Sequence, residues 1–260
     1  MRNVFGFNEE APLVVEGDDF PTLNGTLHDY WRSDKGVTLS GGAVTSWTGQ
    51  ISSNNFAAGT TGGPTVSGSN SGFNNIDTLT FNGTSAGLGL TTSNLQGTNT
   101  GSVHIAIYGA PHGDGGGFGA VFGVSTDGNS PLVNEAVMKA TSTSVIEMYG
   151  FPGGQIAGSS DDTYGKGIYT ITMGDPSGLG TGQRAVFLNK NNNTENAVVN
   201  YSSFTTARQP FLIGAYNALN NADLYGKVDI AGCVIWYNSY GSDFEDDIQA
   251  IESYFQGIYG

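Results

Sequence analysis

Short runs of apolar residues, or of alternating apolar and polar residues, follow one another along most of the chain. In "SVHIAIYG" (102–109), Ile105 and Ile107 fall on one face of an extended strand, and His104 and Tyr108 fall on the other. This alternation predicts a strand with one buried face. We therefore expect His104 to lie on a solvent-exposed or concave face.

Similar runs recur between clusters of Gly, Asn, Asp and Pro. They read TLTFNG (78–83), GAVFGV (119–124), SVIEMYG (144–150), GIYTITMG (167–174), RAVFLNK (184–190), ENAVVNY (195–201), PFLIG (210–214) and KVDIAGCVIWYN (227–238). The last run begins with alternation and becomes continuously apolar, which is typical of a central strand covered on both faces. Many short strands separated by turn residues predict an all-β fold, and we expect a two-sheet antiparallel jelly-roll sandwich.

The segment 242–260 has the helical period instead. Ser242 and Glu245 have the spacing of a capping box, and acidic residues crowd the first turn, where the helix dipole favours them. Apolar residues recur at helical spacing along one face, at Phe244, Ile248, Ile251 and Phe255. We expect one short C-terminal helix that ends near Gly257 and packs on the sheet.

The acidic residues of this helix could also be read as catalytic. Glycoside hydrolysis uses two carboxylates that face the same bond. On a helix, however, positions i and i+2 point ~200° apart, so Glu245 and Asp247 cannot share a substrate. We interpret these acids as a helix cap and a solvated face. The strand "SVIEMYG" offers Glu147 alone, so we expect the chain not to be an enzyme.

Composition narrows the classes of partner. Charged residues make up 12% of the 260-residue chain, and 23 Asp and Glu against 9 Lys and Arg give a net charge of -14. Such a chain repels nucleic-acid phosphates and anionic lipid headgroups, so we expect neither nucleic acid nor a membrane surface as a partner. The length suits one main domain.

Neither the single cysteine nor the N-terminus indicates an exported protein. Cys233 lies in an apolar run, where a buried hydrophobic role is expected. The apolar run 11–15 is framed by glutamates and is shorter than the roughly 7 to 15 residues of a signal-peptide core. We expect no export signal and, because no run approaches about 18 apolar residues, no membrane-spanning helix.

The histidines and the acidic pairs are the candidate metal ligands of the sequence. The 3 histidines, His28, His104 and His112, have none of the close His or Cys spacings of a zinc site. Calcium is the one metal that the acidic residues could bind, through side-chain oxygens of Asp18, Asp19, Asp161, Asp162 and the stretch "TDGN" (126–129). These acids also fit ordinary turns, which is the more economical interpretation. We expect no cofactor.

The stretch "GAPHGDGGGFG" (109–119) combines a histidine, an aspartate and several glycines. A phosphate-binding loop would be followed by a helix, whereas a strand follows here. His112 and Asp114 have no third partner nearby in the sequence. We interpret Pro111 to Gly117 as a turn between strands and expect no chemistry there.

The order of these segments resembles the laminin-G-like branch of the concanavalin A-like lectin and glucanase superfamily. The matching positions are Trp31, Ser33, Asp34, Gly36, Val37, Val44, Trp47, Phe81, Asn82, Gly83, Gly226, Val228, Ile230, Ala231, Tyr237, Tyr254, Tyr259 and Gly260. The resemblance implies a two-sheet jelly roll over residues 23–260, with a concave face that can bind glycans through aromatic side chains. Neither the acidic catalytic strand of the glucanases nor the metal-binding loop of the legume lectins is matched.

A charge-poor, glycine-rich chain without an export signal is typical of a virion component released by lysis. We therefore expect a non-enzymatic structural protein of a bacteriophage, such as a head decoration, fibre or tail accessory protein, whose partners are other virion proteins or copies of itself. A carbohydrate-binding module that recognises a cell-surface glycan is the alternative. A glycoside hydrolase is a third possibility.

An N-terminal arm is expected to precede the sandwich domain, over residues 1–22. Its apolar residues Phe5, Phe7, Leu13 and Val15 would bind a neighbouring subunit by strand addition or by insertion into a pocket. The same arm could equally fold back on its own domain.

Overall fold

A computed structural model of the chain describes residues 19–59, 62–90, 102–112, 119–124, 136–140, 146–150, 154–158, 165–173, 183–190, 193–200, 211–216, 224–238 and 242–260. Within these ranges the chain is almost entirely β-structure, followed by one C-terminal helix. The elements are β1 (Thr26–Arg32), β2 (Val37–Ser40), β3 (Ala43–Thr48), β4 (Asn55–Ala58), β5 (Thr65–Asn70), η1 (Ser71–Phe73), β6 (Ile76–Asn82), β7 (Leu88–Leu90), β8 (Ser102–His112), β9 (Gly119–Val124), β10 (Ala136–Ala140), β11 (Ile146–Gly150), β12 (Gly154–Gly158), β13 (Gly167–Met173), β14 (Gln183–Lys190), β15 (Asn193–Asn200), β16 (Phe211–Ile213), β17 (Ala215–Tyr216), β18 (Leu224–Tyr225), β19 (Lys227–Asn238) and α1 (Ser242–Tyr259).

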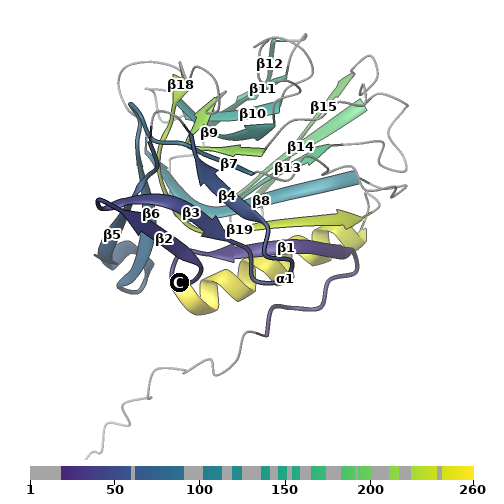
Figure 1. The fold of residues 1–260 in the computed structure, drawn as a ribbon. Helices are drawn as coiled ribbons and strands as arrows, with labels where there is room; N and C mark the ends of the chain where they lie inside the picture. Colours follow the sequence, from purple (N-terminus) through teal and green to yellow (C-terminus); the bar gives the residue numbers. More distant parts are fainter. Residues whose placement is uncertain are drawn as a thin grey trace, which may run out of the picture.

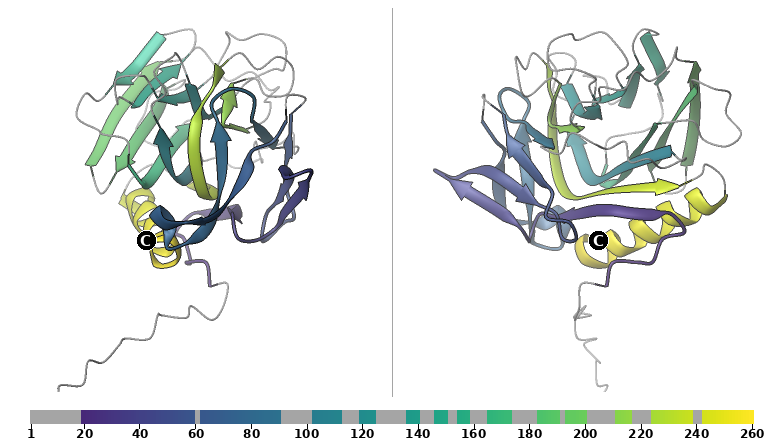
Figure 2. Two further views of the ribbon diagram at one scale, coloured as in Figure 1. Left: turned by 90° about the vertical axis from the view of Figure 1, so that its left-hand side faces the viewer. Right: turned by 45° about the vertical axis from the view of Figure 1, so that its right-hand side comes forward.

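Antiparallel pairing organises the described strands into two long runs. One run is β2–β3–β4–β7–β16–β9–β10–β11–β12. The other is β19–β8–β13–β14–β15, with β1 and β6 both pairing with β19, and β5 pairing with β6. Figures 1 and 2 show the strands curling around a common interior.

Two connections link the runs. Ala43 of β3 pairs with Thr65 of β5. Tyr225 of β18 pairs in parallel with Ala120 of β9, and the chain continues from β18 directly into β19. These bridges join the strands into one curled sheet. The predicted all-β class with a C-terminal helix is confirmed, whereas the separation into two sheets is not.

The interior of the curl is filled by large side chains. Trp31, Trp47 and Phe56 are fully buried, and the ring of Phe56 lies 4.9 Å from that of Trp31 and 5.9 Å from that of Trp47. The indole N–H of Trp47 donates to the Arg32 carbonyl at 2.7 Å, so burying it leaves no unpaired donor. Cys233 belongs to this core, as predicted, and burial raises the pKa of its thiol.

The helix α1 lies on the outer side of the sheet, along β1, β19 and β8 (Figure 1). Its predicted apolar face is buried there, at Phe244, Ile248, Ile251 and Phe255. The helix begins at Ser242, as expected, and continues past Gly257 to Tyr259. Among the described residues, no helix is long and apolar enough to cross a membrane.

Candidate functional site

The outer face of the sheet changes from apolar and covered to polar and exposed along β8. Where α1 covers it, the face is apolar: the ring of Tyr108 stacks on Phe255 at 5.6 Å and lies 6.3 Å from Phe73 of η1. Ala110, the next outward residue, is only partly buried, and His112 after it is exposed. The sheet therefore continues past the region covered by α1 and η1, and its outer face becomes polar.

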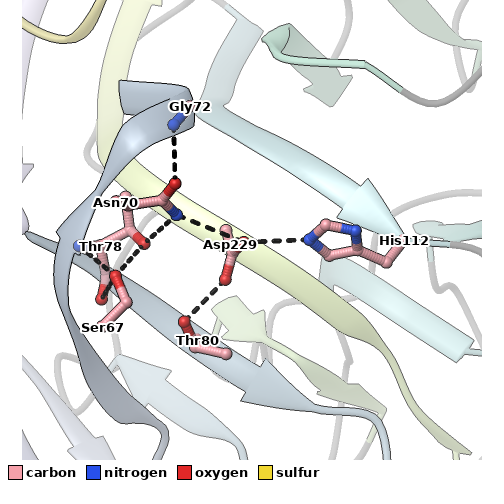
Figure 3. Close-up of polar contacts among 7 residues, drawn as sticks. All are labelled: Ser67, Asn70, Gly72, Thr78, Thr80, His112 and Asp229. Atoms are coloured by element: carbon pink, nitrogen blue, oxygen red, sulfur yellow. Dashed lines mark hydrogen bonds and ion pairs between the residues drawn. The ribbon is translucent and has the colours of Figure 1, made fainter. Parts of the chain in front are cut away.

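Asp229 lies at the centre of this polar region. Its neighbours in register are Thr80 on β6 and Ala110 on β8. The Thr80 hydroxyl donates to Oδ1 at 2.7 Å, and Oδ2 accepts from the Asn70 amide at 3.4 Å and lies 3.0 Å from His112 Nε2 (Figure 3). We refer to Asn70, Thr80, His112 and Asp229 as the Asp229 cluster.

A second set of hydrogen bonds holds Asn70 in place. Its amide donates to the buried Thr78 hydroxyl at 3.0 Å, and its Oδ1 accepts from the backbone N–H of Gly72 at 3.0 Å. The hydroxyls of Thr78 and Ser67 are 2.7 Å apart, and the Thr78 N–H donates to the Ser67 hydroxyl at 3.0 Å (Figure 3). Strand β5, turn η1 and strand β6 thus orient the Asp229 cluster before any ligand arrives.

The charge of Asp229 follows from these contacts. Burial alone would raise the pKa of its carboxyl, but the hydrogen bonds with His112 and from Thr80 outweigh burial and lower the pKa below its ordinary value. Asp229 is therefore ionised at neutral and mildly acidic pH. Its side chain is 16% exposed, so the carboxylate is accessible from outside.

His112 presents the most accessible group of the cluster, with 44% of its side chain exposed. An ionised carboxylate only accepts hydrogen bonds, so the ring nitrogen beside Asp229 must carry the proton. That assigns the proton to Nε2 and leaves Nδ1 of the neutral ring as an acceptor. The cluster thus offers a partly exposed carboxylate and an exposed imidazole acceptor, a combination that suits hydroxyl donors.

Two other carboxylates, the buried Asp29 and the partly exposed Asp34, bind groups of the fold. Asp29 is fully buried and accepts from the N–H of Ile51 at 3.0 Å and from the Ser52 hydroxyl at 2.6 Å. Asp34 receives Arg32 at 2.6 Å. The contacts of Asp29 and Asp34 therefore tie loops to strands, whereas Asp229 lies on the polar outer face described above.

Two sequence-based expectations about histidines need correction. His104 is not on an open face: it is fully buried, with its ring 5.1 Å from Trp236 and 4.4 Å from Phe244. It lies on the predicted outward side of β8, but α1 covers that side. His112 was assigned to a turn beginning at Pro111, whereas β8 continues through both residues, and His112 contacts Asp229.

The acids of α1 do not all lie on its solvated face. Glu245 is exposed and Asp247 is buried, so the two do point apart as predicted. Asp247, however, is not a surface residue: it accepts from the N–H groups of Asn24 at 2.6 Å and Gly25 at 3.0 Å. It binds the start of the domain to the helix.

Several predicted sites lie outside the described residues. These are the arm residues Phe5, Phe7, Leu13 and Val15, the loop residue Asp114, and the acids Asp18, Asp161 and Asp162 with the stretch 126–129. The arm of residues 1–22 and its partner remain a prediction. Within the described part of the chain, no three His, Cys, Asp or Glu residues gather as a metal-binding group.

Comparison with known proteins gives similarity in fold alone. No family model and no curated protein matches the sequence. Among solved structures, the Trypanosoma rangeli sialidase in complex with sialic acid matches 89% of this chain with a TM-score of 0.59 and 13% identity. The same enzyme with 2,3-difluoro-KDN matches 92% of the chain, with a TM-score of 0.57 and 13% identity. An arabinofuranosidase complexed with arabinofuranosyl-α-1,2-xylobiose matches 84%, with a TM-score of 0.55 and 10% identity.

This chain spans only part of these proteins. It covers 33% and 36% of the two sialidase chains and 52% of the arabinofuranosidase chain. Sialidases and arabinofuranosidases are glycoside hydrolases, so the fold occurs in chains of carbohydrate-cleaving enzymes. This finding contradicts the expectation that the chain is not an enzyme.

Proposed function

We propose that the chain is a carbohydrate-binding domain with a concanavalin A-like fold, and that the Asp229 cluster is its sugar-binding surface. One observation carries the proposal. Side chains from β5, β6 and β8 hold the partly exposed Asp229 carboxylate, and the one from β8, the ring of His112, is itself exposed.

Sugar rings carry neighbouring hydroxyl groups that both donate and accept hydrogen bonds. The Asp229 carboxylate and Nδ1 of His112 are acceptors for the hydroxyl donors of such a ligand, so the Asp229 cluster matches it chemically. The side chains are already ordered by the hydrogen bonds to Thr78, Thr80 and Gly72. Binding then costs less side-chain entropy than it would on a surface of mobile side chains.

The positions that resemble the concanavalin A-like superfamily behave as core and turn residues of this fold. Gly36 has a φ of 71° and would bring a Cβ to 2.5 Å from the Thr48 carbonyl oxygen. Asn82 accepts from the N–H groups of Thr84 and Ser85 in the turn that begins at Gly83, where φ is 74°. These contacts support the proposed superfamily, and the carbohydrate-active neighbours support a sugar as ligand.

The proposal concerns binding at this surface. The Asp229 cluster contains one carboxylate, whereas most glycoside hydrolysis needs two that flank the scissile bond.

The setting that the composition predicts is a virion. Of the 260 residues, 9 are Lys or Arg, which leaves few sites for trypsin-like proteases outside a cell. A carbohydrate-binding surface on a particle would attach it to cell-surface glycans. Mass spectrometry of purified particles tests this setting, and absence of the chain from them would contradict it.

A glycan array tests the binding function. We expect the purified chain to retain a defined set of glycans and Asp229→Asn to bind them about 10- to 100-fold more weakly, the loss of one or two hydrogen bonds to a charged group. Asp246→Asn is the matched control, because it removes an exposed carboxylate of α1. The proposal fails if the wild type retains no glycan, or if both variants bind alike.

A further inference from the structure

We infer that the Asp229 cluster selects uncharged sugars over the corresponding sugars that carry a carboxylate. The inference rests on the proposed function and names the ligand class of the same surface. It follows from the negative charge of Asp229 and from the acceptor atoms that Asp229 and His112 present to a ligand.

Asp229 repels a ligand carboxylate. Its oxygens accept from Thr80 and Asn70 and contact His112, and the side chain remains partly exposed. A second carboxylate bound about 6 Å away would lose affinity by ~3-fold under water-like screening and by ~100-fold at the effective dielectric of a protein surface. A sugar hydroxyl at the same place has no such penalty and can donate to Asp229.

The orientation of the His112 ring reinforces this preference. With Nε2–H directed at Asp229, Nδ1 presents a lone pair to the ligand. A hydroxyl can donate to that lone pair, whereas a carboxylate has only lone pairs of its own to offer.

None of the four residues of the Asp229 cluster is an arginine, so the cluster itself offers no guanidinium fork for a ligand carboxylate. Arg32, the one arginine whose side chain the structure describes, is bound to Asp34 at 2.6 and 3.0 Å. Lys227 lies opposite His112 in register and already interacts with another group. Across β19, the residue in register with Lys227 is Asn82, which is uncharged. The titratable and charged groups that the described strands place beside His112 are thus Asp229 and Lys227.

Matched pairs of immobilised sugars test the inference. Galactose and galacturonic acid oligomers form one pair, and glucose and glucuronic acid oligomers form another. At pH 7.5 we expect the neutral member of any pair that binds to have a Kd about 10-fold lower than its acidic partner. Asp229→Asn should reduce this ratio to about 3-fold or less, while Asp246→Asn should leave it unchanged.

Replacing His112 separates a role in selection from a structural one. In His112→Gln, which removes the Nδ1 lone pair, the ratio at pH 7.5 should fall below that of the wild type, and an unchanged ratio would limit selection to Asp229. Equal or tighter binding of the acidic member at pH 7.5 would overturn the inference and leave the binding function standing. Absence of binding to every member, together with an empty glycan array, would refute the proposed function and this inference with it.

Discussion

Replacing Thr80 by valine tests whether the Asp229 cluster is held as the structure indicates. Valine has nearly the same shape but lacks the hydroxyl that donates to Asp229 Oδ1 at 2.7 Å. A hydrogen bond to a charged group contributes about 1.5–3 kcal/mol. We expect the free energy of unfolding at pH 7 to fall by that amount, and the pKa of Asp229 to rise toward its ordinary value.

The pH dependence of this loss gives the sharper result. Because the pKa of Asp229 is lowered in the folded state, its stabilisation is present above the unfolded-state pKa of about 3.9 and is lost as the pH falls through the folded-state value. The deficit of Thr80→Val should therefore be largest at pH 7. At strongly acidic pH it should shrink toward the roughly 1 kcal/mol of a neutral hydrogen bond.

Urea unfolding at pH 7 and under strongly acidic conditions, with a carbon-13 NMR titration of the Asp229 carboxyl, measures both effects. Thr65→Val is the matched control, because Thr65 lies opposite Thr80 on β5 and is exposed. The reasoning is refuted if the deficit is the same at both pH values. It is also refuted if Thr65→Val loses as much stability as Thr80→Val.

Two further substitutions test the packing of the fold. Gly214→Ala should lower the free energy of unfolding by about 2–4 kcal/mol, because residue 214 has a φ of 74° and the new Cβ would lie 1.9 Å from Phe81 Cδ1. Gly257→Ala should instead raise the free energy of unfolding by up to about 1 kcal/mol, because a Cβ at residue 257 of α1 would meet no other atom. Similar shifts of the melting temperature in the Gly214 and Gly257 variants would contradict these two expectations. Burial raises the pKa of Glu252, so wild-type stability should decrease as the pH rises through the range above about 4.3. Glu252→Gln should melt higher than the wild type at pH 7 and at the same temperature below pH 4, and a lower melting temperature at pH 7 would show that the ionised carboxylate stabilises the helix.

Much of the fold could be predicted from local pattern. The alternation in β8 correctly places Ile105 and Ile107 inside, because strand geometry alone determines which residues share a face. What covers the opposite face depends on where α1 docks. The alternation alone therefore predicts a solvent-exposed His104, whereas α1 covers it and its ring lies beside Trp236 and Phe244.

The Asp229 cluster could not be found in the same way. Asp229 and His112 are 117 positions apart in sequence, and Asp229 and Asn70 are 159 apart. Their proximity depends on which strands pair and in what register. A faint signal was present, because an aspartate in the run "KVDIAG" interrupts an otherwise apolar strand and so calls for a partner.

A bulge in β19 decides that Asp229 faces outward. Ile230 pairs with Gly109 and Gly232 with Tyr108, so Ala231 is an extra residue in the ladder. In an unbroken strand, Asp229 would share a face with Cys233 and Ile235, which lie in the inner core. The carboxylate would then be buried among apolar side chains, at a large cost in desolvation.

The bulge shifts the alternation by one residue. Before it Val228 and Ile230 point inward, and after it Cys233 and Ile235 do, so the inner core stays apolar along the whole strand. At the bulge itself, the Cβ that Gly232 lacks would lie 2.2 Å from the Phe255 ring, so a glycine is needed for α1 to dock. One extra residue thus reconciles an apolar core, a docked helix and an outward-facing carboxylate. The candidate site depends on this irregularity of the sheet as much as on its own side chains.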